Sequence, residues 1–110
     1  MEKNIPTTFG CPVELALTVL GGKWKTVILA HLKQGPLRYG ELRARIPALS
    51  DKVLTQRVRD LETLGLVARD KEGAYVLTQR GVSLGPVLQS LYDWGDAAAP
   101  ELGARFRAAG

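Results

Sequence analysis

The sequence contains one cysteine and one histidine among its 110 residues, and this scarcity limits the chemistry available to the protein. A single cysteine forms no disulfide within its own chain, and one cysteine with one histidine cannot supply the ligands of a zinc site. His31 lies in an apolar stretch, so we expect a hydrogen-bonded core residue rather than a metal ligand or a base for a cysteine enzyme. We therefore predict that the protein is not an enzyme and holds no metal or cofactor.

Long apolar runs are also missing. No run approaches the ~18 residues of a membrane span, and the polar first residues lack the apolar segment of a signal peptide. These absences, together with the lone thiol, predict a cytoplasmic protein without a membrane partner. What is present, 45% hydrophobic and 24% charged residues, is typical of one folded domain. A formal net charge of +4 favours a polyanionic partner.

The segment from Ser50 to Gly65 is predicted to be an amphipathic helix with a donor-rich outer face. Its apolar stripe consists of Leu54, Val58, Leu61 and Leu64, and its opposite stripe consists of Lys52, Thr55, Gln56, Arg59 and Thr63. Ser50 is a good N-cap, and Gly65 supplies the left-handed residue that ends a helix. Side chains of this kind suit DNA phosphates and base edges, so we interpret the segment as a recognition helix. The alternative is the solvated face of a core helix.

The remaining chain predicts a mainly α fold with a small β-hairpin. Helices are expected over residues 12–20, 23–33 and 38–46, strands over 66–69 and 74–77, and further helices over about 79–94 and 96–108, with an interruption near Pro100. A short helix, a tight turn, a donor-faced helix and a hairpin form a winged helix-turn-helix. We expect residues 1–10 to be a flexible arm and residues 11–110 to be a single domain.

Several segments resemble, in order and spacing, the HxlR-type winged helix-turn-helix transcriptional regulators, which are relatives of the MarR group. They are Cys11–Val13, Gly21–Trp24, Gly35–Leu42, Ser50–Arg57, Leu61–Val67 and Leu77–Gly81. The resemblance implies a cytoplasmic homodimer that binds pseudo-palindromic double-stranded DNA. It also implies dimerisation through the first helix and the C-terminal helices, about residues 79–108. Some members sense oxidants or electrophiles through the cysteine before this proline, so an oxidant or small-molecule effector is a further partner.

The candidates for DNA contact are Arg38, Ser50, Lys52, Thr55, Gln56, Arg57, Arg59, Arg69 and Lys71. Gln56 is the best base-reading candidate, because its amide can pair with adenine through two hydrogen bonds. Arg57 lies at the edge of the apolar stripe, so an ion pair with Glu41 or Asp60 competes with a phosphate contact. The wing that carries Arg69 and Lys71 has a shorter tip than is usual in the family, which limits the expected wing contacts to phosphate.

Cys11 is the candidate redox-sensing residue. It precedes Pro12 at the start of the first predicted helix, where unpaired amides and the helix dipole favour a thiolate. The alternative is a small buried hydrophobe. Trp24 and Trp94 are expected to be core or interface anchors, with a small-molecule pocket beside them as the alternative. For the whole protein, the alternative to a DNA-binding regulator is a winged-helix module for protein–protein interaction.

Overall fold

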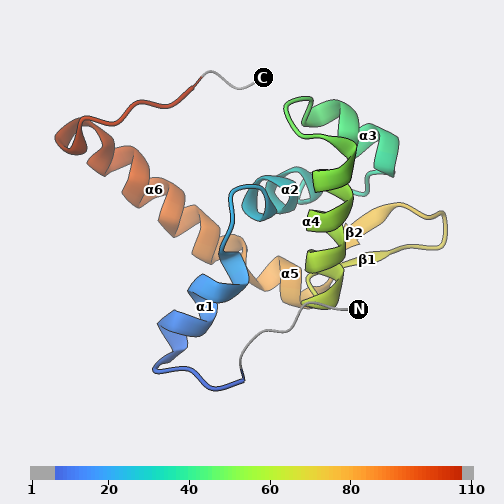
Figure 1. Cartoon of the computed structure of the whole chain (residues 1–110), viewed down its shortest axis with the longest axis horizontal. Coiled ribbons are helices and arrows are strands. Elements are labelled where there is room, and N and C mark those ends of the chain that lie inside the picture. The colour runs from blue at the N-terminus through green and yellow to red at the C-terminus, as the bar shows by residue number, and fades with distance from the viewer. Residues whose placement is uncertain (1–6, 108–110) are drawn as a thin grey trace.

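The computed structural model describes residues 7–107, so the first six positions of the predicted arm lie outside the described residues. The elements are α1 (Pro12–Leu20), α2 (Lys25–Leu32), α3 (Tyr39–Arg45), α4 (Asp51–Thr63), β1 (Val67–Arg69), β2 (Tyr75–Leu77), α5 (Gln79–Ser83) and α6 (Gly85–Leu102) (Figure 1). This order confirms the predicted winged helix-turn-helix.

The core lies between α2, α3, α4 and the hairpin. Ile28, Leu42, Leu54, Leu61 and Leu66 are fully buried there, and these residues come from three successive helices and the turn after α4. Apolar residues at helical spacing give each helix one inward face. The second helix begins at Lys25, two residues after the predicted start, because Trp24 serves as its N-cap.

The ends of α4 follow from local sequence signals. The Ser50 hydroxyl oxygen accepts a hydrogen bond from the amide of Val53 at 3.2 Å, which caps the N-terminus. At the other end, the amide of Leu66 donates to Leu61 O at 2.9 Å and the amide of Gly65 donates to Glu62 O at 3.0 Å. Gly65 has a φ of 75°, so this is the Schellman turn that the sequence predicts.

The wing is a two-stranded antiparallel hairpin in which Val67 pairs with Leu77 and Arg69 pairs with Tyr75. Its turn is held by the Asp70 carboxylate, which accepts hydrogen bonds from the amides of Glu72 and Ala74, both at 2.9 Å. Figure 1 shows the hairpin extending away from the helices on the side of α4 that is opposite to α6.

The predicted break between residues 94 and 96 and the predicted interruption near Pro100 are wrong, because α6 runs through Gly95 and Pro100 as far as Leu102. Glycine in a helix costs only about 1 kcal/mol relative to alanine, and the alanines that follow favour helix. The helix ends instead at Gly103, whose φ of 68° is left-handed. The chain passes from α5 to α6 earlier, at Leu84, just before Gly85 and Pro86.

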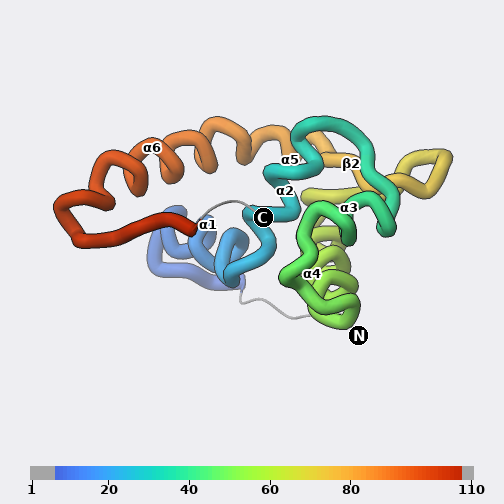
Figure 2. The backbone as a smooth tube through the Cα atoms, turned by 90° about the horizontal axis from the view of Figure 1, so that it is seen from above, coloured from blue at the N-terminus to red at the C-terminus, as the bar shows by residue number. Residues whose placement is uncertain are grey.

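The outer helices α1 and α6 extend from the winged body and leave apolar side chains in solvent. In Figure 2, α6 runs along the edge of the molecule opposite to α4, and α1 lies on its inner side. The exposed large apolar residues of these two helices are Val13, Leu15, Leu17, Val87, Leu91, Tyr92, Trp94 and Leu102. Over residues 7–107, no helix combines the length and the apolar character that a membrane crossing requires.

Candidate nucleic-acid interface

The exposed face of α4 brings together several of the predicted DNA contacts. Lys52, Gln56 and Arg59 are all exposed on successive turns of the helix, and Thr63 follows on the same face. Within the described chain, the side chains of Lys52 and Arg59 make no hydrogen bond or ion pair. Their donors are therefore available to an external acceptor. Thr55 is half-buried, and its hydroxyl donates to the Tyr39 hydroxyl oxygen at 3.4 Å.

A buried carboxylate beneath this face orients Gln56 and binds Arg57. Asp60 is 4% exposed, and its Oδ1 accepts a hydrogen bond from Gln56 Nε2 at 3.1 Å. Arg57 Nη1 lies 3.0 Å from Asp60 Oδ2. The intramolecular ion pair, one of the two alternatives for Arg57, is thus present, and its partner is Asp60 rather than Glu41. The sequence pattern does not predict that Asp60 is buried, because this residue lies beside the apolar stripe of α4 and is not one of its members.

The N-terminus of α4 is tied to α3 by a network that the sequence did not reveal. Asp51 Oδ1 accepts hydrogen bonds from the Tyr39 hydroxyl and from Arg43 Nε, both at 2.9 Å. These contacts, the tyrosine first and the arginine second, hold the pKa of Asp51 below its ordinary value of 3.8. Asp51 also lies at the positive end of the helix dipole. The network joins the first residue of α4 to two residues of α3.

The other predicted basic contacts differ in how free they are. Arg38 is exposed at the start of α3, where its amide donates to the Glu41 carboxylate at 2.8 Å. Lys71 is exposed at the tip of the wing. Arg69 is held against its own strand partner, because Nη2 donates to the Tyr75 hydroxyl at 2.8 Å and the guanidinium carbon lies 4.8 Å from the ring centre. Arg69 therefore has less freedom to reach a phosphate than Lys71 has.

Known proteins match the chain over most of its length. The sequence pattern of the HxlR-like helix-turn-helix family matches residues 19–102. The chain belongs to the HxlR-like helix-turn-helix family of transcriptional regulators. A helix-turn-helix transcriptional regulator of Methanothermobacter thermautotrophicus is 41% identical over 91 residues, which cover 77% of this chain and 70% of that protein.

Solved structures of transcriptional and redox regulators share the fold. Quinone-bound YodB from B. subtilis is 36% identical and superposes with a TM-score of 0.72, covering 79% of this chain and 98% of YodB. The redox regulator HypR in its reduced form is 33% identical and superposes with a TM-score of 0.76, covering 84% of this chain and 98% of HypR.

Cys11 occupies the N-cap position of α1 in this HxlR-like chain. It is exposed, and its side chain makes no capping hydrogen bond within residues 7–107. The alternative of a buried small hydrophobe is therefore wrong. His31 also differs from expectation, since its buried Nδ1 has no hydrogen-bond partner in the described part of the chain. That part also contains no group of three or more metal-ligating side chains.

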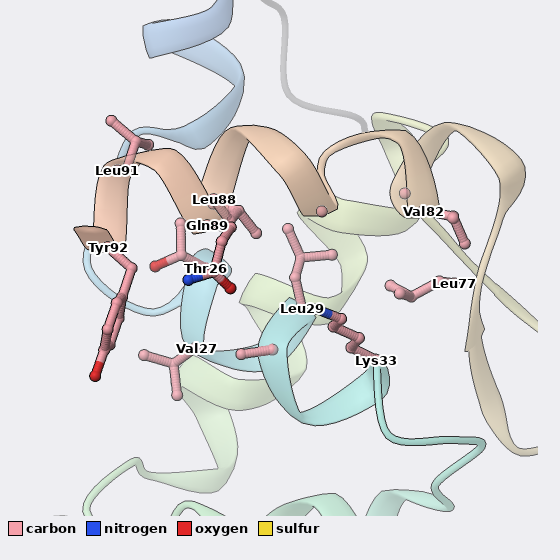
Figure 3. A pocket seen from close by; sticks show the side chains of 13 residues that line it. Thr26, Val27, Leu29, Lys33, Leu77, Val82, Leu88, Gln89, Leu91 and Tyr92 are labelled. Atoms are coloured by element: carbon pink, nitrogen blue, oxygen red, sulfur yellow. The ribbon is translucent and has the colours of Figure 1, made fainter. Parts of the chain in front are cut away.

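A cavity of about 700 Å³ separates α2 from α5 and α6. Its walls are mostly apolar, with Val27 and Leu29 on α2 facing Leu88 and Tyr92 on α6 (Figure 3). Lys33 and Gln89 are among its polar lining residues. Neither tryptophan lines it, so this cavity is not the small-molecule pocket that was the alternative for Trp24 and Trp94. Trp24 packs against the core, whereas Trp94 is 69% exposed.

Proposed function

We propose that this protein regulates transcription by binding double-stranded DNA as a homodimer, with one α4 helix of each protomer in the major groove of a pseudo-palindromic operator. The single observation that carries the proposal is the exposed stripe of Lys52, Gln56 and Arg59, whose two basic side chains have no acceptor among the described residues. Membership of a family of helix-turn-helix regulators supports the same function. We place the protein in the cytoplasm, where its operator would be.

Gln56 is the base-reading residue in this proposal. Asp60 accepts from Nε2 and so turns the amide in a fixed direction, leaving Oε1 and the second N–H of Nε2 for adenine. Arg59 suits guanine or a phosphate, while Lys52, the Ser50 hydroxyl and Thr55 suit phosphates or base edges near the start of α4. Arg38 and Lys71 are assigned to flanking phosphates. Arg57 and Arg69 are assigned supporting roles, because each already binds a residue of its own chain.

The exposed apolar faces of α1 and α6 support the homodimer. Monomeric proteins rarely expose large contiguous apolar patches, and such patches mark sites of association. Side chains such as Leu17, at 62% exposure, and Trp94 gain little from remaining in water. Pairing of these helices with a second copy would remove them from solvent and place two α4 helices in one particle.

Cys11 is the proposed point of regulation by oxidants or electrophiles. The support is its exposure and its position at the end of α1, together with the similarity of the chain to quinone-bound YodB and to the redox regulator HypR. A thiolate there can be alkylated or oxidised. Modification beside the proposed dimer interface would change the separation of the two α4 helices, which must match one turn of DNA, about 34–36 Å.

Selection of bound fragments from random duplex DNA tests the proposal. We expect an enriched palindrome with half-sites about one helical turn apart, and loss of preference at the central bases of each half-site with Gln56→Ala. Enrichment of fragments without a common sequence would contradict sequence-specific regulation. Absence of binding at low salt would favour a winged helix that contacts protein instead.

The proposed regulation through Cys11 has its own test. Treatment with a quinone should release the operator from the natural chain but not from Cys11→Ser.

A further inference from the structure

The C-terminal end of α4 is bound by side chains that come from the start of α5. The Thr78 hydroxyl donates to Gly65 O at 2.6 Å, and Arg80 Nη1 donates to Leu64 O at 2.9 Å. Carbonyl groups in the last turn of a helix and in its cap have no hydrogen-bond donor inside the helix, so they accept hydrogen bonds from groups elsewhere. Arg80 also places positive charge at the negative end of the helix dipole.

Thr78 joins two helices through one hydroxyl group. While its hydrogen is donated to Gly65 at the end of α4, its oxygen accepts from the amide of Gly81 at 3.0 Å and so caps α5. The amide of Thr78 also donates to Leu66 O at 3.0 Å. The end of one helix and the beginning of the other are thus held by the same residue.

The two helices meet too closely for any extra atom. A Cβ at Gly81 would overlap the carbonyl oxygen of Leu66, and a Cβ at Gly65 would meet the Arg80 guanidinium. Gly81 is itself buried. Since backbone lies against backbone here, the junction has little room to bend by side-chain rearrangement.

The arm beyond the junction is nearly continuous. Leu84 ends α5 and begins α6 with the helical angles φ −80° and ψ −10°. Its amide donates to Gly81 O at 3.1 Å, and the amide of Leu88 donates to Leu84 O at 2.9 Å. Figure 1 shows α5 beside the lower end of α4 and α6 leading away from it. A change of direction at the end of α4 would therefore be carried along α6.

We propose that Thr78 and Arg80 are positioning residues that fix the angle between the recognition helix α4 and the arm formed by α5 and α6. In the homodimer, this angle sets the separation of the two α4 helices and hence the half-site spacing that the protein accepts. The consequence for spacing rests on the proposed function, whereas the rigid angle is a property of the single chain. One base pair changes the separation of half-sites by about 3.4 Å and rotates them around the duplex, so small changes of angle matter.

The rigid angle is tested by a distance within one chain. Spin labels are attached to Lys52→Cys on α4 and Ser90→Cys on α6 in a Cys11→Ser background, and the labelled chain is diluted with unlabelled protein so that distances between protomers do not contribute. We expect one narrow distance distribution, which Thr78→Val and Arg80→Ala both broaden. Thr78→Ser, which keeps the hydroxyl, should remain narrow. Distributions for Thr78→Val and Arg80→Ala as narrow as that of the parent would overturn the proposal.

The spacing consequence is tested with synthetic palindromes whose half-sites are moved apart or together in single base pairs. The natural chain should lose about tenfold in affinity for each step away from its optimum, a cost similar to that of one mismatched base pair. Thr78→Val and Arg80→Ala should flatten this profile to less than about threefold while binding a single half-site as before. Arg105→Ala, which removes the same charge from an exposed site beyond α6, should keep the sharp profile.

The distance measurement and the spacing profile together distinguish failure of the positioning role from failure of the proposed function. A variant that merely folds less well binds all spacings more weakly by the same factor, and the unchanged shape of the profile would count against the positioning role. If Arg80 contacts a phosphate instead, Arg80→Ala should lower the salt dependence of binding to every duplex, whereas loss of a positioning role leaves that dependence unchanged. If the natural chain binds no DNA, the proposed function fails, and the distances still decide whether Thr78 and Arg80 fix the angle.

Discussion

The helices of the winged body and the two outer helices both carry an apolar stripe, but the stripe is buried in the body and exposed on the outer helices. In the body, Ile28, Leu54 and Leu61 are completely buried against neighbouring elements of the same chain. In the outer helices, Leu17 of α1 and Trp94 of α6 keep most of their surface in water. Helical periodicity reports only that a face is apolar. Whether the cover comes from the same chain or from another molecule depends on where the fold places that face.

The largest expected effect comes from breaking the proposed cover of α6. Trp94→Asp places a charge in the apolar face and should convert the dimer to a monomer. Because a monomer loses the second half-site, operator affinity should fall by about 100-fold or more. Sedimentation and operator titration measure the two changes together. Gln89→Glu, which adds a charge at an exposed position on another side of the same helix, is the matched control and should remain dimeric. A dimeric Trp94→Asp would remove α6 from the interface.

The body should respond to substitution in the opposite manner. Leu54→Ala leaves a cavity in the closed core of each chain, so we expect the free energy of unfolding to fall by about 2–5 kcal/mol. Leu17→Ala, compared in the monomeric Trp94→Asp background, should change the free energy by less than about 0.5 kcal/mol, because its side chain is already exposed. Urea denaturation followed by circular dichroism measures both. Similar costs for the two substitutions would show that α1 packs within its own chain.

The contrast also explains how much of the fold the sequence could predict. The ends of α4 were predictable, because Ser50, Gly65 and Leu66 act on backbone groups within a few residues of themselves. The end placed at Gly95 was wrong, since a helix-breaking tendency of about 1 kcal/mol is easily outweighed by neighbours. Local sequence signals are reliable where one backbone conformation is clearly favoured, and weak where several conformations are close in energy.

The site was predictable only where it faces solvent. The exposed stripe of Lys52, Gln56 and Arg59 follows from helical spacing alone. The buried Asp60 beneath it, the Tyr39 hydroxyl beside Asp51 and the Thr78 hydroxyl on Gly65 each depend on segments brought together by folding or on burial. Two acids were open as partners of Arg57, and only the folded geometry selects Asp60.

Gln56→Ala tests the exposed polar stripe of α4. Removing a bidentate base contact should cost about 1–3 kcal/mol on the selected operator and much less on random duplex, because phosphate contacts remain. Lys52→Ala is the contrasting variant. It should weaken binding to both duplexes equally and lower the slope of log affinity against log salt by about 1 per protomer. Equal losses for Gln56→Ala on operator and random duplex would reassign that residue to the DNA backbone.

The smallest effect is expected from the hydrogen bonds that link α3 to Asp51 at the start of α4, both of which are elements of the winged body. The Tyr39 hydroxyl and the Arg43 guanidinium lower the pKa of Asp51, so the folded state binds its proton less readily than the unfolded chain. These hydrogen bonds therefore stabilise the fold above the ordinary carboxyl value of 3.8 and are lost as the pH falls below it. Asp51→Asn should reduce stability slightly near neutral pH, and the difference from the natural chain should vanish in acid. Because both contacts join residues of one chain, the same pH dependence is expected in the monomeric Trp94→Asp background. A difference that disappears in that background would mean that dimerisation, rather than the Tyr39 and Arg43 contacts, perturbs Asp51.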